Sequence, residues 1–453
     1  MTFIKNRSEL LSTGSTEGRR IALEIIEHTL MSIDSYTKVK EAIRWENDTT
    51  LRVVDMSYDL SAIDNVYVLG AGKATFPIAR ALEEIMGSRL RQGLVIVKKG
   101  YGKKLKRIEV LEAGHPIPDE VAVQGSKRIV EIARQADEQD LVFCAITGGA
   151  SSLMSLPVQG ISLRDKQRVT KLLLQSGVTL YETNTVRKHI SAVKGGKLAQ
   201  CIHPARIVNL IVIDEVEGVP WGPTVPDETT FQDAIGVLKR HDIWNRTPQS
   251  IKRYLMRGIA NPALETPKQR DFGNIRVQNV VLADNQTACE AARQGAAILG
   301  LDSMILSSQV EGESREAGII LACIAKNVEK IGEPMRPPCV LIMGGETTVR
   351  LSKHWGLGGP SQELALGASL KIAGSRRITI ASLDTDGTDG PTSVAGGIVD
   401  GCTLKRAAKR NVDVFKNLMD HNSLKVLTQL NDAIVTGPTG TNVADLTVAV
   451  ITQ

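Results

Sequence analysis

Short runs of aliphatic and β-branched residues recur along the chain, each followed by a glycine-rich turn and then by a helical pattern. The clearest example is the run at residues 65–70, which ends in glycine and precedes a helical pattern that continues to Met86. These runs do not alternate apolar with polar positions, so both faces of each strand are expected to be buried. Such burial is typical of a parallel sheet covered by helices on both sides. Similar runs in the first half of the chain lie at residues 93–97, 141–146 and 207–213.

A second set of apolar runs predicts a second sheet. Its expected strands lie at residues 279–282, 303–306, 339–343, 378–382 and 446–451. Residues 244–272 between the two sets are polar and contain three prolines, which indicates a domain transition. The first sixty residues are expected to be helical. Since single cores stop growing near about 250–300 residues, 453 residues predict two domains, at 1–250 and 275–453.

The predicted fold is therefore α/β with two lobes. Each lobe is expected to hold a mainly parallel, Rossmann-like sheet flanked by helices, with a cleft between the lobes. The composition, with 4% aromatic residues and 40 glycines, favours this class over an all-β binding module or a disordered chain.

Charge and cysteine usage narrow the class of protein further. A formal net charge of only +5 gives no reason to expect a nucleic-acid partner. The six cysteines form no C-x-x-C pair, which argues against a zinc ribbon or a redox dithiol. No apolar signal core opens the sequence, and no run approaches the roughly 18 apolar residues of a membrane span. We expect a cytoplasmic protein that has no membrane partner.

Two glycine turns follow predicted strands of the first set. Residues 70–73 (Gly-Ala-Gly-Lys) lack Walker spacing, and Thr75 stands where a dinucleotide fingerprint needs its third glycine. The alternative is an ordinary strand–helix turn with a solvated Lys73. Residues 147–152 (Thr-Gly-Gly-Ala-Ser-Ser) suit a nest for an oxyanion, or else a helix start capped by serine.

Two further glycine clusters and an aspartate loop mark the second half of the chain. Residues 344–348 and 356–363 are close in sequence, which favours a phosphate-cradling role. The loop at 384–392 places three aspartates within six residues, a pattern that suits Mg²⁺. Ala395 at the twelfth position excludes an EF-hand. The alternative for this loop is a polar turn held by Asx hydrogen bonds.

Weaker signals come from three other segments. Residues 436–442 are small and polar, and they either line a pocket or make a turn. The basic segment at 185–197 contains His189 and Lys194; such segments are usually solvated, although here Lys194 precedes two glycines. His115 is interpreted as structural. The sequence has no G-x-S-x-G, H-E-x-x-H or C-x-x-C motif, so hydrolase and zinc-enzyme functions lose support.

Taken in order, these motifs resemble the class II glycerate kinase family, whose C-terminal part is called the MOFRL domain. They cover nearly the whole chain. The resembling segments lie at residues 70–74, 113–116, 148–149, 191–199, 222–227, 344–348, 362–366, 386–392 and 436–445.

The resemblance implies a kinase that uses ATP and a divalent metal, Mg²⁺, to convert D-glycerate into 2-phosphoglycerate in the cleft between its domains. Lys73 corresponds to the family's catalytic lysine, and it would stabilise charge on the transferring phosphoryl group. From the chemistry we add Asp386 and Asp389 as catalytic candidates and Asp384 and Asp386 as metal ligands. The expected nucleotide- and substrate-binding residues are Gly72, Gly148, Gly149, Ser151, Lys194, Glu346, Thr347, Gln362 and Asn442. A homodimer is compatible with these expectations.

Three departures from the family pattern bear on the substrate. Pro360 replaces the arginine of a Gly-Gly-Arg-Asn-Gln-Glu pattern, Ala150 replaces a glycine, and Trp221 replaces a small residue. Three alternatives therefore stay open: a kinase of another sugar acid, a nucleotide-binding regulator without activity, and a hydroxypyruvate reductase that uses NAD(P)H. The reductase needs an acidic residue at the end of the second strand, where Lys98 and Lys99 stand instead.

Overall fold

The computed structural model describes residues 2–176, 178–214, 221–351 and 355–453. The chain divides into two units by its internal contacts. The central unit consists of residues 35–213 and 221–282, and the terminal unit consists of residues 2–34, Asp214 and 283–453. The expected division at 1–250 and 275–453 differs from this one, because the first helices belong with the C-terminal residues.

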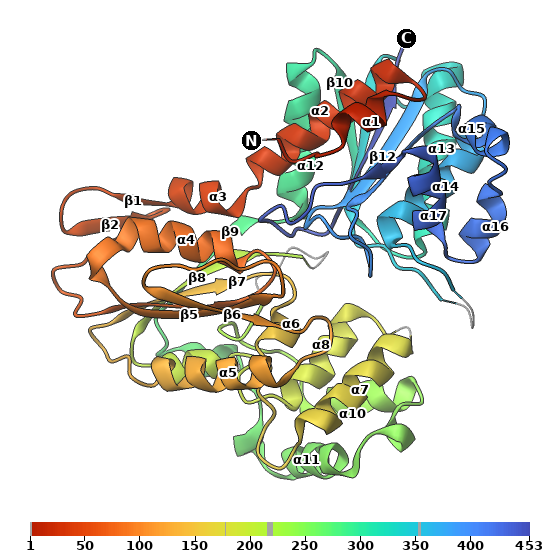
Figure 1. Ribbon diagram of the computed structural model, residues 1–453. Helices are drawn as coiled ribbons and strands as arrows, with labels where there is room; N and C mark the ends of the chain where they lie inside the picture. The colour runs from red at the N-terminus through yellow and green to blue at the C-terminus, as the bar shows by residue number, and fades with distance from the viewer. Residues whose placement is uncertain (1, 177, 215–220, 352–354) are drawn as a thin grey trace. The chain divides into compact units, whose positions relative to one another are not determined.

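The central unit holds the predicted parallel sheet (Figure 1). The pairs β4/β5, β4/β7, β5/β6 and β7/β8 are all parallel, and β4 and β7 are buried along their whole lengths. Burial on both faces explains why these strands read as continuous apolar runs. In spatial order the strands are β6 (Ile108–Ala113), β5 (Leu90–Lys98), β4 (Val66–Ala71), β7 (Leu141–Ile146), β8 (Arg206–Val212) and β9 (Val277–Ala283).

Strand β9 corrects one sequence prediction. The run at 279–282 was expected to begin the second sheet, but β9 lies at the edge of the first sheet beside β8. The amide of Ile207 donates to the carbonyl of Arg276 at 2.8 Å, and the Asn209 side-chain amide donates to Asn279 Oδ1 at 2.6 Å. An apolar run reports burial but does not identify the sheet that it joins.

The first sixty residues are also not helical throughout. After α3 (Ser35–Ala42) the chain forms a small antiparallel sheet of β1 (Ile43–Trp45), β2 (Thr50–Val53) and β3 (Met56–Asp59). In β2, buried Leu51 and Val53 alternate with partly exposed residues, as expected for a strand with one covered face.

Helices cover both faces of the parallel sheet, with α4 and α5 on opposite sides (Figure 1). A separate group of helices packs around its own core, which includes Val169, Leu173, Phe231 and Leu255. The helices of the central unit after α3 are α4 (Thr75–Met86), α5 (Glu120–Ala133), α6 (Ala150–Leu153), α7 (Leu163–Gln175), α8 (Leu180–His189), α9 (Lys197–Ile202), α10 (Phe231–Arg240) and α11 (Gln249–Ala260). Short 3-10 turns lie at Gly87–Arg89, Trp244–Arg246, Pro262–Leu264 and Gln269–Phe272.

The sheet of the terminal unit is mixed, so the prediction of a mainly parallel second sheet is wrong. Among its described pairs, only β10/β11 is parallel, while β11/β15, β12/β15, β12/β13 and β13/β14 are antiparallel. In spatial order its strands are β10 (Asp302–Val310), β11 (Cys339–Gly345), β15 (Asp445–Ile451), β12 (Ile378–Asp384), β13 (Gly396–Asp400) and β14 (Ala433–Ile434).

Successive residues of these strands enter two different cores, which explains the error. Val340 and Ile342 pack with α2 and α12, whereas Leu341 and Met343 pack with α13 and α14. Since both faces are covered, an antiparallel strand here is as apolar as a parallel one. The helices of this unit are α1 (Arg7–Leu11), α2 (Thr16–Ser32), α12 (Asn285–Ile298), α13 (Ser314–Ile331), α14 (Pro360–Ile372), α15 (Thr403–Lys409), α16 (Val414–Met419) and α17 (Ser423–Leu430). Within the described ranges, no helix combines the length and apolar character that a membrane crossing requires.

Candidate active site

The parallel sheet reverses its strand order between β4 and β7. Ligands of open α/β sheets bind at such switch points, beyond the carboxyl ends of the strands. Ala71 and Ile146 are register partners at the ends of β4 and β7, and Gly72 and Thr147 of the two predicted glycine turns come directly after them. The Lys73 amide donates to the Gly148 carbonyl oxygen at 2.8 Å. The two turns therefore form one structure at the switch point.

Glycine is required at two positions in this structure. Gly72 has φ +144°, and a methyl group there would overlap the Thr147 hydroxyl. Gly149 has φ +83°, and a methyl group there would lie 3.1 Å from the His115 ring and 3.2 Å from Lys73 Cγ. The side chains of Lys73 and His115 thus lie directly beside Gly149. A cation beside an open glycine turn suits a phosphate or a carboxylate group.

Other predicted residues adjoin the same turn. The Ser151 hydroxyl donates to Asn184 Oδ1 at 3.3 Å, and Lys194 Nζ donates to the Ala150 carbonyl at 3.4 Å. The motif beginning at Gly222 reaches this end of the sheet too, since a methyl group on that glycine would lie 3.2 Å from Ile146 Cγ2.

The basic segment at 185–197 is not a solvated face, which corrects its usual interpretation. Arg187, His189 and Lys194 are all buried. Burial, followed by the charges of Lys166 and Arg187, holds the pKa of Lys194 well below its ordinary value.

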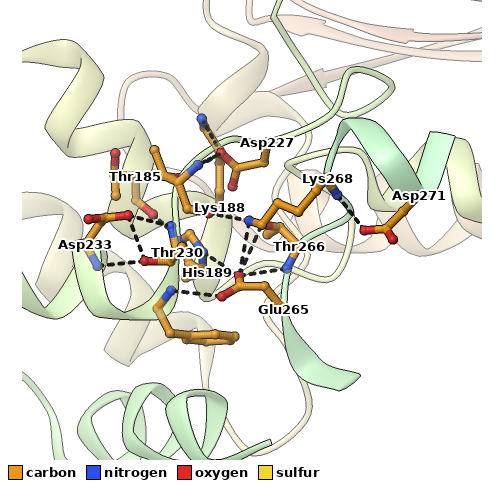
Figure 2. A network of polar contacts seen from close by, with 12 residues as sticks. Thr185, Lys188, His189, Asp227, Thr230, Asp233, Glu265, Thr266, Lys268 and Asp271 are labelled. Carbon is orange, nitrogen blue, oxygen red and sulfur yellow. Dashed lines mark hydrogen bonds and ion pairs between the residues drawn. The ribbon is translucent and has the colours of Figure 1, made fainter. Parts of the chain in front are cut away.

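A polar network holds this segment in place (Figure 2). His189 contacts the Thr185 carbonyl at 2.7 Å through Nδ1 and the Glu265 carboxylate at 2.9 Å through Nε2. Burial disfavours ionisation of Glu265, but hydrogen bonds from His189 and from the Thr266 amide outweigh it and lower its pKa to about 2. Lys188 Nζ donates to Asp227 at 3.0 Å. These contacts give His189 and Lys188 structural roles in holding the segment that leads to Lys194.

The terminal unit gathers acidic residues at one edge of its sheet. Because β15 runs antiparallel between β11 and β12, its first residue, Asp445, is the register partner of both Gly345 and Asp384. Burial raises the pKa of Asp445 well above its ordinary value, and the charges of Asp389 and Glu346 raise it further. The predicted residues Glu346 and Asp384 therefore lie at one edge, together with Asp445, which was not predicted individually.

The aspartate loop contains the Asx hydrogen bonds that are expected if the loop is a polar turn. Asp386 Oδ1 accepts hydrogen bonds from the amide and the hydroxyl of Thr388, both at 2.7 Å. The Asp386 amide donates to Asp384 Oδ1 at 2.9 Å. These bonds order the loop while they leave the carboxylates gathered at the end of β12.

Asp389 lies at the start of α14. It accepts the amide of Ser361 at 3.2 Å and that of Gln362 at 2.8 Å, and burial raises its pKa to about 7. Pro360, which replaces the family arginine, is the first residue of this helix, where its missing N–H costs nothing. Asp389 therefore supports a helix start, and its catalytic role stays a prediction.

Three predicted binding residues are held by neighbours within the terminal unit. Gln362 Nε2 donates to the Thr392 hydroxyl at 3.0 Å, and Thr347 accepts from the Ser314 hydroxyl at 2.9 Å. Asn442 Nδ2 donates to Asp214 Oδ2 at 3.4 Å. Their contacts with ligands stay predictions.

Within the part of the chain that the structure describes, no group of three His, Cys, Asp or Glu side chains is arranged to enclose a metal ion. Mg²⁺ is usually held by one or two carboxylates together with waters and substrate phosphates, and it rarely has a full protein cage. The oxygen donors of Asp384 and Asp386 fit that mode of binding.

Sequence reasoning missed Lys166 and Arg187, and it assigned His115 a structural role although its ring lies beside Gly149. A signal for Lys166 was present. It shares one face of α7 with Val169, Thr170 and Leu173, and a charge in such a stripe indicates a buried cation.

Comparisons with known proteins identify the family. The MOFRL family model matches residues 339–445, and a domain of unknown function, DUF4147, matches residues 21–256. Glycerate 2-kinase from Pyrococcus horikoshii is 43% identical, over 96% of this chain and 98% of that protein. The chain belongs to the glycerate 2-kinase family. The predicted family is thus confirmed.

Two other known proteins are also similar to this chain over most of its length. The crystal structure of a glycerate kinase from Thermotoga maritima superimposes with a TM-score of 0.79 at 35% identity, covering 95% of this chain and 99% of that one. A protein from Agrobacterium vitis named putative hydroxypyruvate reductase is 36% identical over 84% of this chain and 97% of its own length.

Proposed function

We propose that this chain transfers the terminal phosphoryl group of ATP to a small hydroxy acid, with the 2-hydroxyl of D-glycerate as the acceptor. The observation that supports this most directly is the joined turn at the switch point, where Lys73 lies beside Gly149 in a chain of the glycerate 2-kinase family.

Phosphoryl transfer depends mainly on positioning and on stabilising charge. The Lys73 ammonium group would neutralise negative charge on the transferring group, and the turn at Gly148–Gly149 lets phosphate oxygens approach the backbone. Mg²⁺, held by Asp384 and Asp386, would neutralise charge on the nucleotide phosphates.

A base is needed to accept the proton of the attacking hydroxyl. Each oxygen of Asp389 accepts a backbone amide of α14, so its carboxylate already serves the helix. Asp386, on the same loop, is therefore our preferred base, with Asp389 as the alternative; in that role Asp386 would leave the metal to Asp384.

The test is a coupled assay with Mg·ATP and a panel of acids that includes D-glycerate, tetronates and other sugar acids. Lys73→Ala should lose at least about 100-fold in kcat, since removal of one charge-stabilising group typically costs that much. Lys127→Ala, an exposed lysine on α5, serves as the matched control. Full activity in Lys73→Ala, or no transfer to any acid by the wild type, would refute the proposal.

The name of the Agrobacterium vitis relative motivates one alternative, reduction of hydroxypyruvate. Strand β5 ends at Lys98, where a nicotinamide site usually has an acidic residue that binds the ribose. We therefore favour the kinase. Consumption of NADH or NADPH with hydroxypyruvate, measured at 340 nm on the same preparation, would reverse this preference.

A further inference from the structure

Three cationic side chains are buried within the helical part of the central unit. Lys166 on α7 is 2% exposed, Arg187 on α8 is 8% exposed, and Lys194, five residues after α8 ends, is 7% exposed. Across the described ranges, none of the three forms an ion pair with a carboxylate, and Lys166 Nζ has no hydrogen-bond partner. Within the described part of the chain, no carboxylate therefore compensates these three cationic groups.

Such a group is unfavourable for folding. A buried charge without a partner is strongly destabilising, and an apolar side chain of similar size would pack at less cost. Burial, and then the charges of Arg187 and Lys197, lower the pKa of Lys166 to about 7, and burial lowers that of Arg187 to about 10. The fold alone gives no reason for cations at these positions.

The contacts of the group connect it to the glycine turn. Lys194 Nζ donates to the carbonyl of Ala150, the residue that follows Gly149. The neighbouring Ser151 hydroxyl donates to Asn184 on α8, three residues before Arg187 and so on the same side of that helix. The buried cations therefore lie next to the turn that carries Lys73 and Gly149.

We propose that Lys166, Arg187 and Lys194 form an oxyanion subsite beside the glycine turn. Its ligand is a carboxylate or phosphate group of the substrates, either the carboxylate of the hydroxy acid or a phosphate of the nucleotide. A guanidinium group binds such planar or tetrahedral oxyanions through paired N–H donors, and two ammonium groups add charge. The inference rests on the proposed function, which supplies both anions.

The decisive variant is Lys166→Met, which keeps the length and apolar stem of the side chain and removes its charge. Lys171→Met is the matched control, because Lys171 is an exposed lysine on the same helix. Binding of D-glycerate alone and of ATP alone is measured by calorimetry and by ligand-induced shifts in Tm, so no turnover is needed.

We expect Lys166→Met to weaken the binding of one of the two ligands at least tenfold. The Tm of the unliganded protein should stay equal or rise. Weaker binding of D-glycerate would show that the subsite holds the acceptor, and weaker binding of ATP would show that it holds the nucleotide. Unchanged binding of both ligands would overturn the proposal. A clear drop in the unliganded Tm would also overturn it, because it would reveal a structural partner for this lysine.

Failure of the subsite and failure of the kinase proposal give different results. If the wild type phosphorylates none of the acids but inorganic phosphate raises its Tm and not that of Lys166→Met, only the kinase proposal fails. If the wild type phosphorylates D-glycerate and the variant retains both KM values, only the subsite proposal fails.

Discussion

The backbone amide of Lys73 donates a 2.8 Å hydrogen bond to the carbonyl oxygen of Gly148. This bond joins two turns that lie about seventy-five residues apart in sequence, because β4 and β7 are adjacent parallel strands that end together. The lysine side chain is thereby placed beside Gly149. Each glycine turn is weak evidence for a site when taken alone, but this hydrogen bond places both turns in one candidate site.

Gly149→Ala should reduce activity more than stability. The methyl group would crowd Lys73 Cγ and the His115 ring, each within 3.2 Å, and φ +83° would add strain of about 1–2 kcal/mol. We expect a lower kcat/KM and a modest loss of Tm. Gly160→Ala is the control, since it has φ +90° but nothing within 4 Å of the added methyl group. Equal loss of activity in both variants would show that backbone strain alone is responsible.

Arg19→Met tests whether the N-terminal helices are part of the terminal unit. Arg19 on α2 is fully buried and contacts Asp400 at 2.7 Å and Asp432 at 2.8 Å. Its removal leaves two buried carboxylates without that partner, and breaking such a pair typically costs about 3–5 kcal/mol. Denaturant unfolding of the variant should show this loss.

The neighbouring residue supplies the control for that experiment. Arg20→Met removes an exposed arginine that pairs with Glu24 on the surface of the same helix. Exposed pairs of this kind contribute about 0–1 kcal/mol. Similar unfolding free energies for both variants would contradict the tie between α2 and the terminal sheet.

Asp389→Asn separates support of a helix from catalysis. Burial raises the pKa of Asp389 from its ordinary 3.8 to about 7, so the folded state binds more protons than the unfolded state between these values. The wild type should therefore lose stability as the pH rises from about 4 to about 7. The variant should lose this part of the pH dependence, measured as the free energy of unfolding.

Activity of the same variant decides the role of the carboxylate. If Asp389 only caps α14, the loss of kcat should be no larger than the loss of folded protein explains. The Tm of the variant measures that loss of stability. Asp413→Asn is a suitable control, because Asp413 caps α16 from an exposed position through the Lys416 amide. A loss of about 100-fold or more in kcat with an intact fold would instead identify Asp389 as the base.

Lys166 should produce the opposite pH dependence of stability. Its pKa falls from 10.5 to about 7, first through burial and then through Arg187 and Lys197. Between these values the unfolded state binds more protons, so stability should rise with pH from about 7 to about 10.5. Comparing wild type with Lys166→Met over this range measures the effect. A constant difference between the two proteins would show that Lys166 is not perturbed.

Local sequence was sufficient to predict the strands that carry the site and the turns that follow them. The runs ending at Leu69 and Ile146 are apolar on both faces, and glycines with positive φ stand where the chain must turn tightly. These features can be recognised within one segment, because an apolar run and a glycine turn are both visible from neighbouring residues alone. The resemblance then identified the family, and the comparisons confirmed it.

Only the tertiary structure decided how those segments are combined. The placement of residues 2–34 with the C-terminal strands, of β9 beside β8, and of β15 antiparallel between β11 and β12 depends on partners far away in sequence. The same holds for the buried cation at Arg187, because a charged residue has the same sequence letter whether it is solvated or enclosed. An apolar or charged pattern records the environment that a segment needs, whereas long-range packing determines which neighbours provide it.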